Sequence, residues 1–315
     1  MSKTPLLILE PDYFSQDALR ILETRFQVLE STQAASSYAE VLVAGLGHQL
    51  DEGLLKNFPN LRLIASVTTG TNHIDSAYLD SRGVELVSLR SIKDDIAGVR
   101  STAELTVGLI LAAARRITQS HLSVVGPNLW DRMKFFGPEL RGQKLGILGY
   151  GRIGRMVGDM AQSLGLRIHA FDPLEVAPPG LRMSTFEDVL AESDIVSIHA
   201  SYSGAQILGS PEIQMMQPGA FLINTSRGEL VSEAAIASAV KSGHLGGYAA
   251  DVVSGENLRD WRIESDPLVT LAREGYNVTI TPHLGGCTSQ GFEVTQLAMA
   301  RFLVSSFEPA TGISR

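Results

Sequence analysis

The sequence lacks several features that mark whole classes of proteins. Its 315 residues include one cysteine, Cys287, which excludes both an internal disulfide framework and a zinc site with several cysteine ligands. The motifs HExxH and CxxC are absent, so we expect no metal site, and the GxSxG of many serine hydrolases is absent as well. A single cysteine is typical of a reducing compartment, and we therefore expect a cytoplasmic protein.

The charge balance and the hydrophobic runs exclude two kinds of partner. The chain carries 26 basic and 34 acidic side chains, a formal net charge of −8, and it has no run of lysine or arginine. Such a chain has no electrostatic reason to bind nucleic acid or an anionic membrane. The longest uncharged apolar stretch with a helical pattern, Leu105–Ala114, is far shorter than the roughly 20 residues that span a bilayer. We expect neither nucleic acid nor a membrane as a partner.

What the chain does contain is a regular alternation of short apolar runs and amphipathic stretches. This alternation predicts an α/β fold, and runs that are apolar throughout indicate strands of parallel sheets covered by helices on both faces. We expect strands at Leu6–Leu9, Val41–Ala44, Leu63–Val67, Val84–Val87, Leu145–Leu148, Ile168–Phe171, Ile195–Ile198, Ala220–Ile223, Tyr248–Val252 and Val278–Ile280.

Helix signals lie between these runs. Ser101 and Glu104 have the spacing of a capping box that opens a long helix. Ser210, followed by a proline, predicts a second helix start with Ser210 as the N-cap residue. A final helix is expected at about 289–306.

The length of the chain, at about 150 residues per domain, predicts two domains. The first occupies residues 1–97 and the second occupies residues 98–286, while the last segment, 287–315, completes the first domain. We expect each domain to hold a parallel sheet flanked by helices, with a cleft between the two domains.

A glycine-rich turn stands directly after the strand expected at Leu145–Leu148. The turn reads Gly149-Tyr150-Gly151-Arg152-Ile153-Gly154 and precedes a helical face and a second strand that ends at Asp172. Gly149 permits the tight turn, Gly151 lets the backbone approach a pyrophosphate, and Gly154 lets helix and strand pack closely. Asp172 would accept hydrogen bonds from ribose hydroxyls and repel a 2′-phosphate, which favours NAD over NADP. The alternative is a purely structural turn.

Three later strands each end in a polar segment that contains one candidate for chemistry: Arg227, Glu256 and His283. Ligands bind at the carboxyl ends of parallel strands, so we expect these side chains to face a ligand. His283 is suited to donate a proton near neutral pH, and a carboxylate bonded to it, from Glu256, would raise its pKa. The fork of Arg227 is suited to bind a substrate carboxylate and to polarise the adjacent carbonyl.

The segments GYGRIG, INTSRGELV and TPHLGG, in this order, make the sequence similar to the D-isomer-specific 2-hydroxyacid dehydrogenase family over nearly its whole length. The resemblance implies an NAD-dependent D-2-hydroxyacid dehydrogenase, an oxidoreductase. It implies a flavodoxin-like substrate and catalytic domain, 1–97 completed by 287–315, and a Rossmann dinucleotide-binding domain, 98–286. In that family's terms Arg227 binds the 2-oxo acid, Glu256 partners the histidine, and His283 is the general acid/base.

The resemblance also assigns contacts that the residues alone do not reveal. The backbone amides of Thr69 and Gly70 would bind the substrate carboxylate, together with the side chain of Arg227. The implied cofactor contacts are the residues of the glycine-rich turn, Asp172, His199, Ala200, Thr225 and Asp251. A homodimer built on the helix at 101–116 is implied as well.

Some positions depart from the family's usual pattern, and they concern the substrate. Asn257 stands where a proline usually follows the glutamate, and Ala44–Gly47 stands where many members have an arginine–serine pair. Without that arginine a phosphorylated substrate is disfavoured relative to glyoxylate or hydroxypyruvate, although a phosphoglycerate dehydrogenase-like enzyme stays open. The alternatives for function are an NAD(H)-sensing binding protein or corepressor of the same fold, and a formate- or phosphite-type dehydrogenase.

Overall fold

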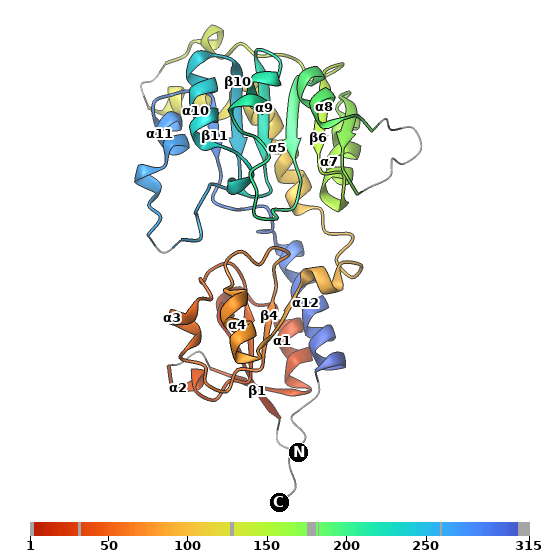
Figure 1. Ribbon diagram of the computed structural model, residues 1–315, viewed down its shortest axis with the longest axis vertical. Helices are drawn as coiled ribbons and strands as arrows, with labels where there is room; N and C mark the ends of the chain where they lie inside the picture. Colours follow the sequence, from red (N-terminus) through yellow and green to blue (C-terminus); the bar gives the residue numbers. More distant parts are fainter. Residues whose placement is uncertain are drawn as a thin grey trace, which may run out of the picture. The chain divides into compact units, whose positions relative to one another are not determined.

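The computed structural model describes residues 3–30, 33–126, 129–174, 181, 183–258 and 260–307, which form two compact units (Figure 1). The described residues of Met1–Val99, Asn257–Arg259 and Thr288–Arg315 make up unit 1. Those of Arg100–Glu256 and Asp260–Cys287 make up unit 2. The last helix of the chain therefore lies in the same unit as the N-terminal sheet.

Unit 1 is built on a five-stranded parallel sheet in the order β2-β1-β3-β4-β5. Its elements are β1 (Thr4–Ile8), η1 (Pro11–Tyr13), α1 (Gln16–Glu23), β2 (Phe26–Leu29), α2 (Gln33–Ser36), β3 (Val41–Ala44), α3 (Glu52–Leu55), β4 (Leu63–Ser66), α4 (Ser76–Arg82), β5 (Glu85–Ser88), η2 (Leu89–Ile92) and α12 (Ser289–Ser306). Helices α1 and α12 pack against each other over one core, which includes Leu22 and Met299. A second core contains Leu55 and Leu79 of α3 and α4.

Unit 2 is built on a six-stranded parallel sheet in the order β11-β10-β9-β8-β6-β7. Its elements are α5 (Ser101–Arg115), α6 (Ile117–Val125), η3 (Arg132–Phe135), β6 (Lys144–Leu148), α7 (Arg152–Ser163), β7 (Arg167–Phe171), α8 (Phe186–Glu192), β8 (Ile195–Ile198), α9 (Ser210–Met215), β9 (Ala220–Asn224), η4 (Gly228–Leu230), α10 (Glu233–Ser242), β10 (Leu245–Ala250), η5 (Ile263–Ser265), α11 (Pro267–Arg273) and β11 (Val278–Ile280). Helices α5 and α7 share one core, and α8 to α11 share another. The prediction of two parallel-sheet α/β domains is confirmed.

The order of the strands reverses once in each sheet, and this locates where ligands bind. In unit 1 the reversal falls between β1 and β3, which is the flavodoxin-like order. In unit 2 it falls between β6 and β8. In open parallel sheets the crevice outside the carboxyl ends at such a reversal is the usual ligand site. No helix among the described residues is long and apolar enough to cross a bilayer.

Three details of the sequence interpretation are wrong. The N-cap residue of α5 is Arg100 and has no side-chain cap, because Ser101 already lies inside the helix and the capping box does not form. The N-cap residue of α9 is Gly209 rather than Ser210, and the side chain of Glu212 accepts the Gly209 amide at 2.8 Å. Strand β2 was not predicted, because only its first residue, Phe26, is buried and the segment does not read as an apolar run.

Candidate active site

The glycine-rich turn follows β6 at the strand reversal of unit 2. Gly149 has a φ of +95°, and a Cβ there would lie 2.6 Å from the backbone nitrogen of Ala200. A Cβ at Gly154 would lie 2.2 Å from the carbonyl oxygen of Gly149. A Cβ at Gly151, by contrast, would meet no atom within 4 Å, so the space in front of this residue is open. Two of the glycines are required for packing, and the third leaves room for a ligand.

This turn fits the pyrophosphate and ribose of a dinucleotide. Gly151 is the N-cap residue of α7 without a side-chain cap, and α7 is 12 residues long, so its positive end faces the open space. Asp172 follows β7, and its two oxygens accept the amides of Tyr150 at 2.8 Å and Leu174 at 2.9 Å. The Asp172 carboxylate is therefore fixed beside the turn.

The other residues of the turn contribute in different ways. The Tyr150 side chain is buried inside unit 2, with the Arg155 guanidinium 5.3 Å from its ring centroid, so its backbone is the part at the turn. Arg152 and Ile153 begin α7 and are half-buried. Burial lowers the pKa of Arg152 from its ordinary value.

Three further predicted cofactor residues, His199, Ala200 and Thr225, lie at the ends of β8 and β9. Nε2 of His199 is 2.9 Å from the Ser197 hydroxyl, and burial lowers the pKa of His199 to about 3, so the imidazole is neutral at pH 7. The backbone of His199 and Ala200 packs directly against Gly149. The hydroxyl of Thr225, after β9, lies 2.8 Å from that of Thr106 on α5.

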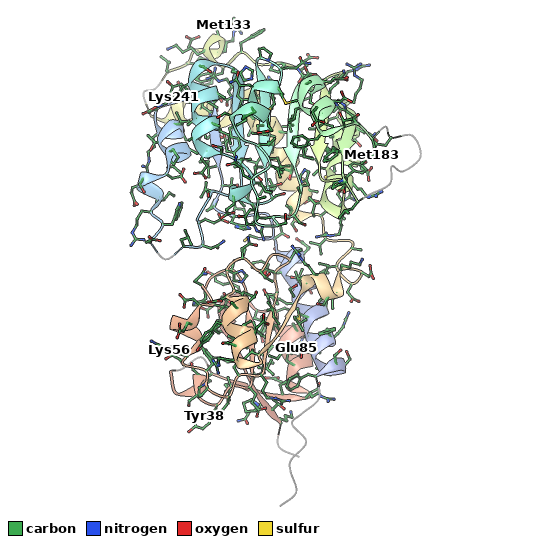
Figure 2. The ribbon with its side chains drawn as sticks, in the orientation of Figure 1. Tyr38, Lys56, Glu85, Met133, Met183 and Lys241 are labelled. Atoms are coloured by element: carbon green, nitrogen blue, oxygen red, sulfur yellow. The ribbon has the colours of Figure 1, made fainter. Side chains whose placement is uncertain are left out.

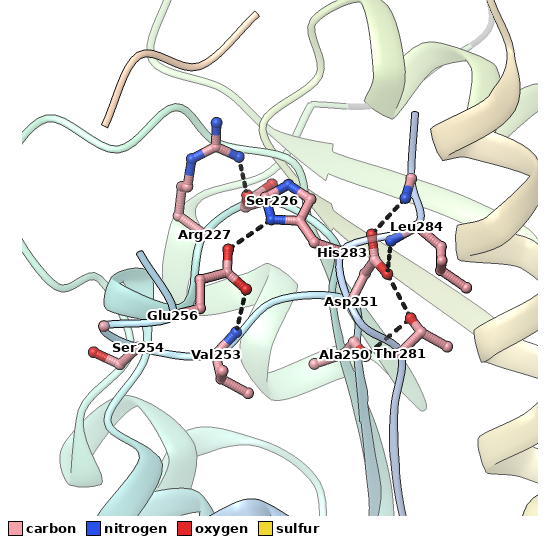
Figure 3. A network of polar contacts seen from close by, with 12 residues as sticks. Ser226, Arg227, Ala250, Asp251, Val253, Ser254, Glu256, Thr281, His283 and Leu284 are labelled. Carbon is pink, nitrogen blue, oxygen red and sulfur yellow. Dashed lines mark hydrogen bonds and ion pairs between the residues drawn. The ribbon is translucent and has the colours of Figure 1, made fainter. Parts of the chain in front are cut away.

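Arg227 stands on a tightly hydrogen-bonded segment after β9. The Asn224 side chain accepts the Ser226 amide at 3.0 Å and donates to the Arg227 carbonyl at 2.8 Å. The Ser226 hydroxyl donates to the carbonyl of Ile198 on β8 at 2.8 Å. The Arg227 guanidinium donates to the Ser226 carbonyl at 2.6 Å (Figure 3). This strand end therefore holds a half-buried cation in a defined place.

His283 and Glu256 form a short contact at the next two strand ends. Nδ1 of His283 lies 2.6 Å from Oε1 of Glu256, and their side chains are 23% and 15% exposed (Figure 3). His283 has a φ of +53°, a conformation that costs a residue other than glycine about 1–3 kcal/mol. Its amide donates to the Asp251 carbonyl at 2.9 Å. The histidine is thus held in a strained backbone conformation with its ring on a carboxylate.

Asp251 has a task that the sequence interpretation missed. This side chain is 1% exposed and accepts three hydrogen bonds, from the Thr281 hydroxyl at 2.5 Å and from the amides of Leu284 and Gly285, each at 2.7 Å. Burial raises the pKa of Asp251, and the three donors oppose that rise. Asp251 therefore anchors the segment on both sides of His283. A lone acid within the apolar run at Tyr248–Val252 was the available signal.

The corresponding edge of unit 1 is made mainly of backbone. After β4 the carbonyls of Thr68, Thr69 and Gly70 accept hydrogen bonds from the Leu89 amide, the Arg90 guanidinium and the Thr68 hydroxyl, respectively. Thr69 is exposed, whereas Gly70 is buried. These bonds direct the carbonyls of the loop toward unit 1 itself.

A carboxylate occupies the strand reversal of unit 1. Glu10 follows β1, and its two oxygens accept the amides of Gly45 at 2.9 Å and Gly47 at 3.1 Å, both in the loop after β3. A Cβ at Gly47 would lie 2.9 Å from Oε1 of Glu10. The missing arginine of this loop is visible in the sequence, but the carboxylate bound to the loop is not.

The chemistry of the unit 2 edge follows from these positions. A dinucleotide turn, an arginine and a carboxylate-bound histidine stand at the carboxyl ends of strands in one sheet, and hydride transfer to a carbonyl requires such a proton donor. Fold and site together define an NAD(H)-dependent oxidoreductase.

Comparison with known proteins identifies the family. The model of the D-isomer specific 2-hydroxyacid dehydrogenase NAD binding domain matches residues 107–285. D-3-phosphoglycerate dehydrogenase of Escherichia coli (strain K12) is 32% identical over 292 residues, which cover 91% of this chain and 69% of that protein. The chain belongs to the D-isomer specific 2-hydroxyacid dehydrogenase family.

Solved structures agree with this assignment. The TT0316 protein from Thermus thermophilus is 25% identical, with a TM-score of 0.78 over 98% of this chain and 99% of that one. D-lactate dehydrogenase from Aquifex aeolicus, complexed with NAD and lactic acid, shares the fold at 24% identity, with a TM-score of 0.77 over 95% and 94% of the two chains. The predictions of an oxidoreductase and of NAD as its cofactor are confirmed.

Proposed function

We propose that His283, Glu256 and Arg227 carry out the interconversion of a 2-oxo acid and a D-2-hydroxy acid. The observation that carries this proposal is the 2.6 Å contact between Nδ1 of His283 and Oε1 of Glu256. Because Nδ1 is committed to the carboxylate, Nε2 is the ring nitrogen that gives its proton to the substrate oxygen. Glu256 favours the charged imidazolium and keeps it oriented until then.

Arg227 binds the substrate carboxylate in this proposal. A guanidinium fork can bind both carboxylate oxygens, and its charge stabilises the negative charge that develops on the neighbouring carbonyl oxygen. The half-buried environment of Arg227 strengthens such an interaction relative to water.

The cofactor would be held by the glycine-rich turn, with its pyrophosphate in the open space at Gly151 and its ribose on Asp172. His199, Ala200, Thr225 and Asp251 complete the proposed contacts. NADH held there would supply the hydride for C2 of the substrate. In the oxidative direction His283 takes the proton back from the hydroxyl group.

The two units divide the work. Residues 98–286 are the proposed dinucleotide-binding domain, and residues 1–97, completed by 287–315, are the proposed substrate domain. The amides of Thr69 and Gly70 are the proposed donors to the substrate carboxylate. The bonds made by the carbonyls of this loop support the proposal, because they leave the opposite side of each peptide for a ligand.

A small substrate without a phosphate, such as glyoxylate or hydroxypyruvate, is the proposed substrate class. The E. coli relative is named for phosphoglycerate, but in this chain the Glu10 carboxylate lies at the strand reversal of unit 1, where ligands bind. A phosphate near this carboxylate would be repelled, whereas a hydrogen atom or a hydroxymethyl group would not.

A cytoplasmic homodimer is the proposed form of the protein. The α5 helix expected at the interface packs on α7, β9 and β10 of its own unit. Large apolar side chains are exposed just beyond it, at Ile117, Leu122, Val125, Trp130, Met133 and Phe136, and Figure 2 shows Met133 at the outside of unit 2. A second copy would cover these side chains, and sedimentation velocity measures whether the protein is a dimer.

The test is the loss of NADH absorbance with glyoxylate, hydroxypyruvate, pyruvate, phenylpyruvate and 3-phosphohydroxypyruvate. We expect turnover with the first two and the lowest kcat/KM with the phosphorylated acid. Tight NADH binding without turnover of any 2-oxo acid would favour the sensing protein over the enzyme. Turnover confined to formate or phosphite in the presence of NAD would contradict the proposed substrate class.

A further inference from the structure

Glu256 reaches His283 from a tight turn that follows β10. The Glu256 amide donates to the Val253 carbonyl at 3.4 Å, and Gly255 has a φ of +74°. Glycine at the third position permits this turn, since other residues rarely adopt a positive φ. The turn itself has few side chains that could hold it, because Ser254 and Gly255 are small.

Carboxylates hold this turn by its backbone. Three consecutive amides each donate to a different one: Val253 to Oε2 of Glu256 at 3.4 Å, Ser254 to Oε1 of Glu233 at 2.6 Å, and Gly255 to Oε1 of Glu229 at 3.2 Å. The bond to Glu233 is the shortest of the three. Hydrogen bonds to a charged acceptor are about twice as strong as neutral ones.

Two of these carboxylates, those of Glu229 and Glu233, come from the segment that directly follows Arg227. Glu229 lies on η4 and Glu233 begins α10. Between Arg227 and Glu229, a Cβ at Gly228 would lie 2.1 Å from the carbonyl carbon of Val253, so the two backbones are in contact. The segment of the arginine and the turn of the glutamate are thereby packed and hydrogen-bonded as one body.

The surroundings of Glu233 disfavour the charged form of its carboxyl group. Burial raises its pKa to about 7, and the nearby carboxylates of Asp266, at the start of α11, and Glu229 add to the rise, while the bond from Ser254 opposes it. The negative charge of Glu233 in turn helps to raise the pKa of the buried Tyr248 on β10, after the larger effect of burial. Carboxyl groups with strongly raised pKa values cluster at functional sites.

We propose that Glu233 is a positioning residue that fixes the Ser254–Glu256 turn and so keeps the Glu256 carboxylate on Nδ1 of His283. The inference rests on the roles proposed above for Glu256 and His283. Without this bond the turn is free to shift, and a displacement of about 1 Å in catalytic groups can lower a rate about 100-fold.

The test compares Glu233→Ala with Glu233→Gln. The alanine variant loses the acceptor for the Ser254 amide, and we expect kcat to fall about 10–100-fold while KM and the NADH dissociation constant change less than about twofold. The glutamine variant keeps an amide oxygen for the same bond, and its kcat stays within about threefold of the wild type. Glu274→Gln is the matched control, because Glu274 makes only a 3.8 Å surface pair with Lys241 among the ion pairs of the described residues.

The pH profile separates positioning from a general loss of structure. Reduction requires protonated His283, and a misplaced Glu256 no longer favours the charged imidazolium, so we expect the alkaline limb of the kcat/KM profile of Glu233→Ala to move to lower pH. Glu233→Gln and Glu274→Gln leave the profile in place. A purely structural role of Glu233 would reduce the active fraction without moving the alkaline limb of the profile, and that result would overturn the proposal.

Two further variants keep the test decisive. If Glu233→Ala does not fold, as judged by circular dichroism and NADH binding, Glu233→Asp replaces it, because the shorter aspartate side chain withdraws from the Ser254 amide. An unshifted pH profile of Glu233→Asp also overturns the proposal. His283→Ala is measured in parallel. Wild-type turnover in His283→Ala would refute both the proposed function and this inference, whereas an inactive His283→Ala with a normal Glu233→Ala refutes the inference alone.

Discussion

At the carboxyl edges of both sheets, carboxylates accept hydrogen bonds from the backbone amides of a loop, but the two loops carry different groups. In unit 1 the Glu10 carboxylate holds the amides of Gly45 and Gly47. In unit 2 the carboxylates of Glu229 and Glu233 hold two amides of the turn before Glu256. Both edges therefore fix a loop by placing an acid on its backbone.

The difference lies in what the fixed loop carries. The unit 2 turn ends in Glu256, which contacts His283, so its acids serve a group that takes part in proton transfer. The bonded residues of the unit 1 loop are glycines without side chains, so the Glu10 carboxylate itself is the charged group at that edge. From this comparison we expect changes in unit 2 to alter the rate of the reaction, and changes in unit 1 to alter the choice of substrate.

The largest effect should come from His283→Ala. Loss of the proton donor lowers kcat by about 100- to 10,000-fold, while NADH binding by fluorescence titration stays nearly intact. His283→Asn is the second variant, because asparagine tolerates the positive φ of this position. The exposed His121 on α6 supplies the control, His121→Ala. Unchanged turnover in both His283 variants would remove the catalytic role from unit 2.

Gly151→Ala should weaken the cofactor without harming the fold. The added methyl group meets no protein atom within 4 Å but enters the space proposed for the pyrophosphate, so we expect the NADH dissociation constant to rise about tenfold or more. Gly98→Ala is the control, since a Cβ there is equally unobstructed and the residue lies outside the glycine-rich turn. Equal NADH affinity in both variants, with unchanged Tm values, would contradict the proposed site.

Features of the fold and site that depend on a short segment of sequence could be predicted, whereas contacts between residues far apart in the chain could not. The GxGxxG turn, Arg227 and His283 stand in local patterns at strand ends, and those patterns follow from local backbone requirements. Strand β2 and the clamp of Glu10 on Gly45 and Gly47 escaped prediction. Strand β2 shows no apolar run because only its first residue, Phe26, is buried, and a bond between residues 35 apart depends on tertiary packing that no short pattern records.

Glu10→Gln tests the unit 1 side of the comparison. The glutamine side chain keeps one acceptor oxygen for the loop but carries no negative charge to repel a phosphate. The ratio of kcat/KM for 3-phosphohydroxypyruvate to kcat/KM for hydroxypyruvate should therefore rise about 3- to 10-fold. The rise should shrink at high salt. Glu85→Gln is the control, because Glu85 is exposed and begins β5, at the amino ends of the strands of the same sheet. The same ratio in both variants would mean that Glu10 does not select the substrate.

The smallest effect concerns stability and pH in unit 2. The pKa of Glu233 is raised to about 7 in the folded protein, above its ordinary value of 4.5, so its contribution to stability is complete below about pH 4.5 and is lost as the pH rises through 7. Glu233→Gln cannot ionise and escapes that loss. The difference in Tm between Glu233→Gln and the wild type should therefore be more positive at pH 8.5 than at pH 5. We expect a change of about 2–4 °C in this difference, after allowance for the partial exposure of Glu233.

The Tm measurement also bears on why an acid is present at this position. A glutamine that equals the wild type in turnover and exceeds it in stability at high pH would mean that the turn needs only an oxygen acceptor. A glutamine that gains stability but shifts the pH profile of kcat/KM would mean that the negative charge of Glu233 also acts on the Glu256–His283 pair. Glu274→Gln should show no such pH-dependent gain, because its side chain is 46% exposed and its partner Lys241 is at the surface. A parallel gain in that control would assign the effect to the net charge of the chain instead of to the turn.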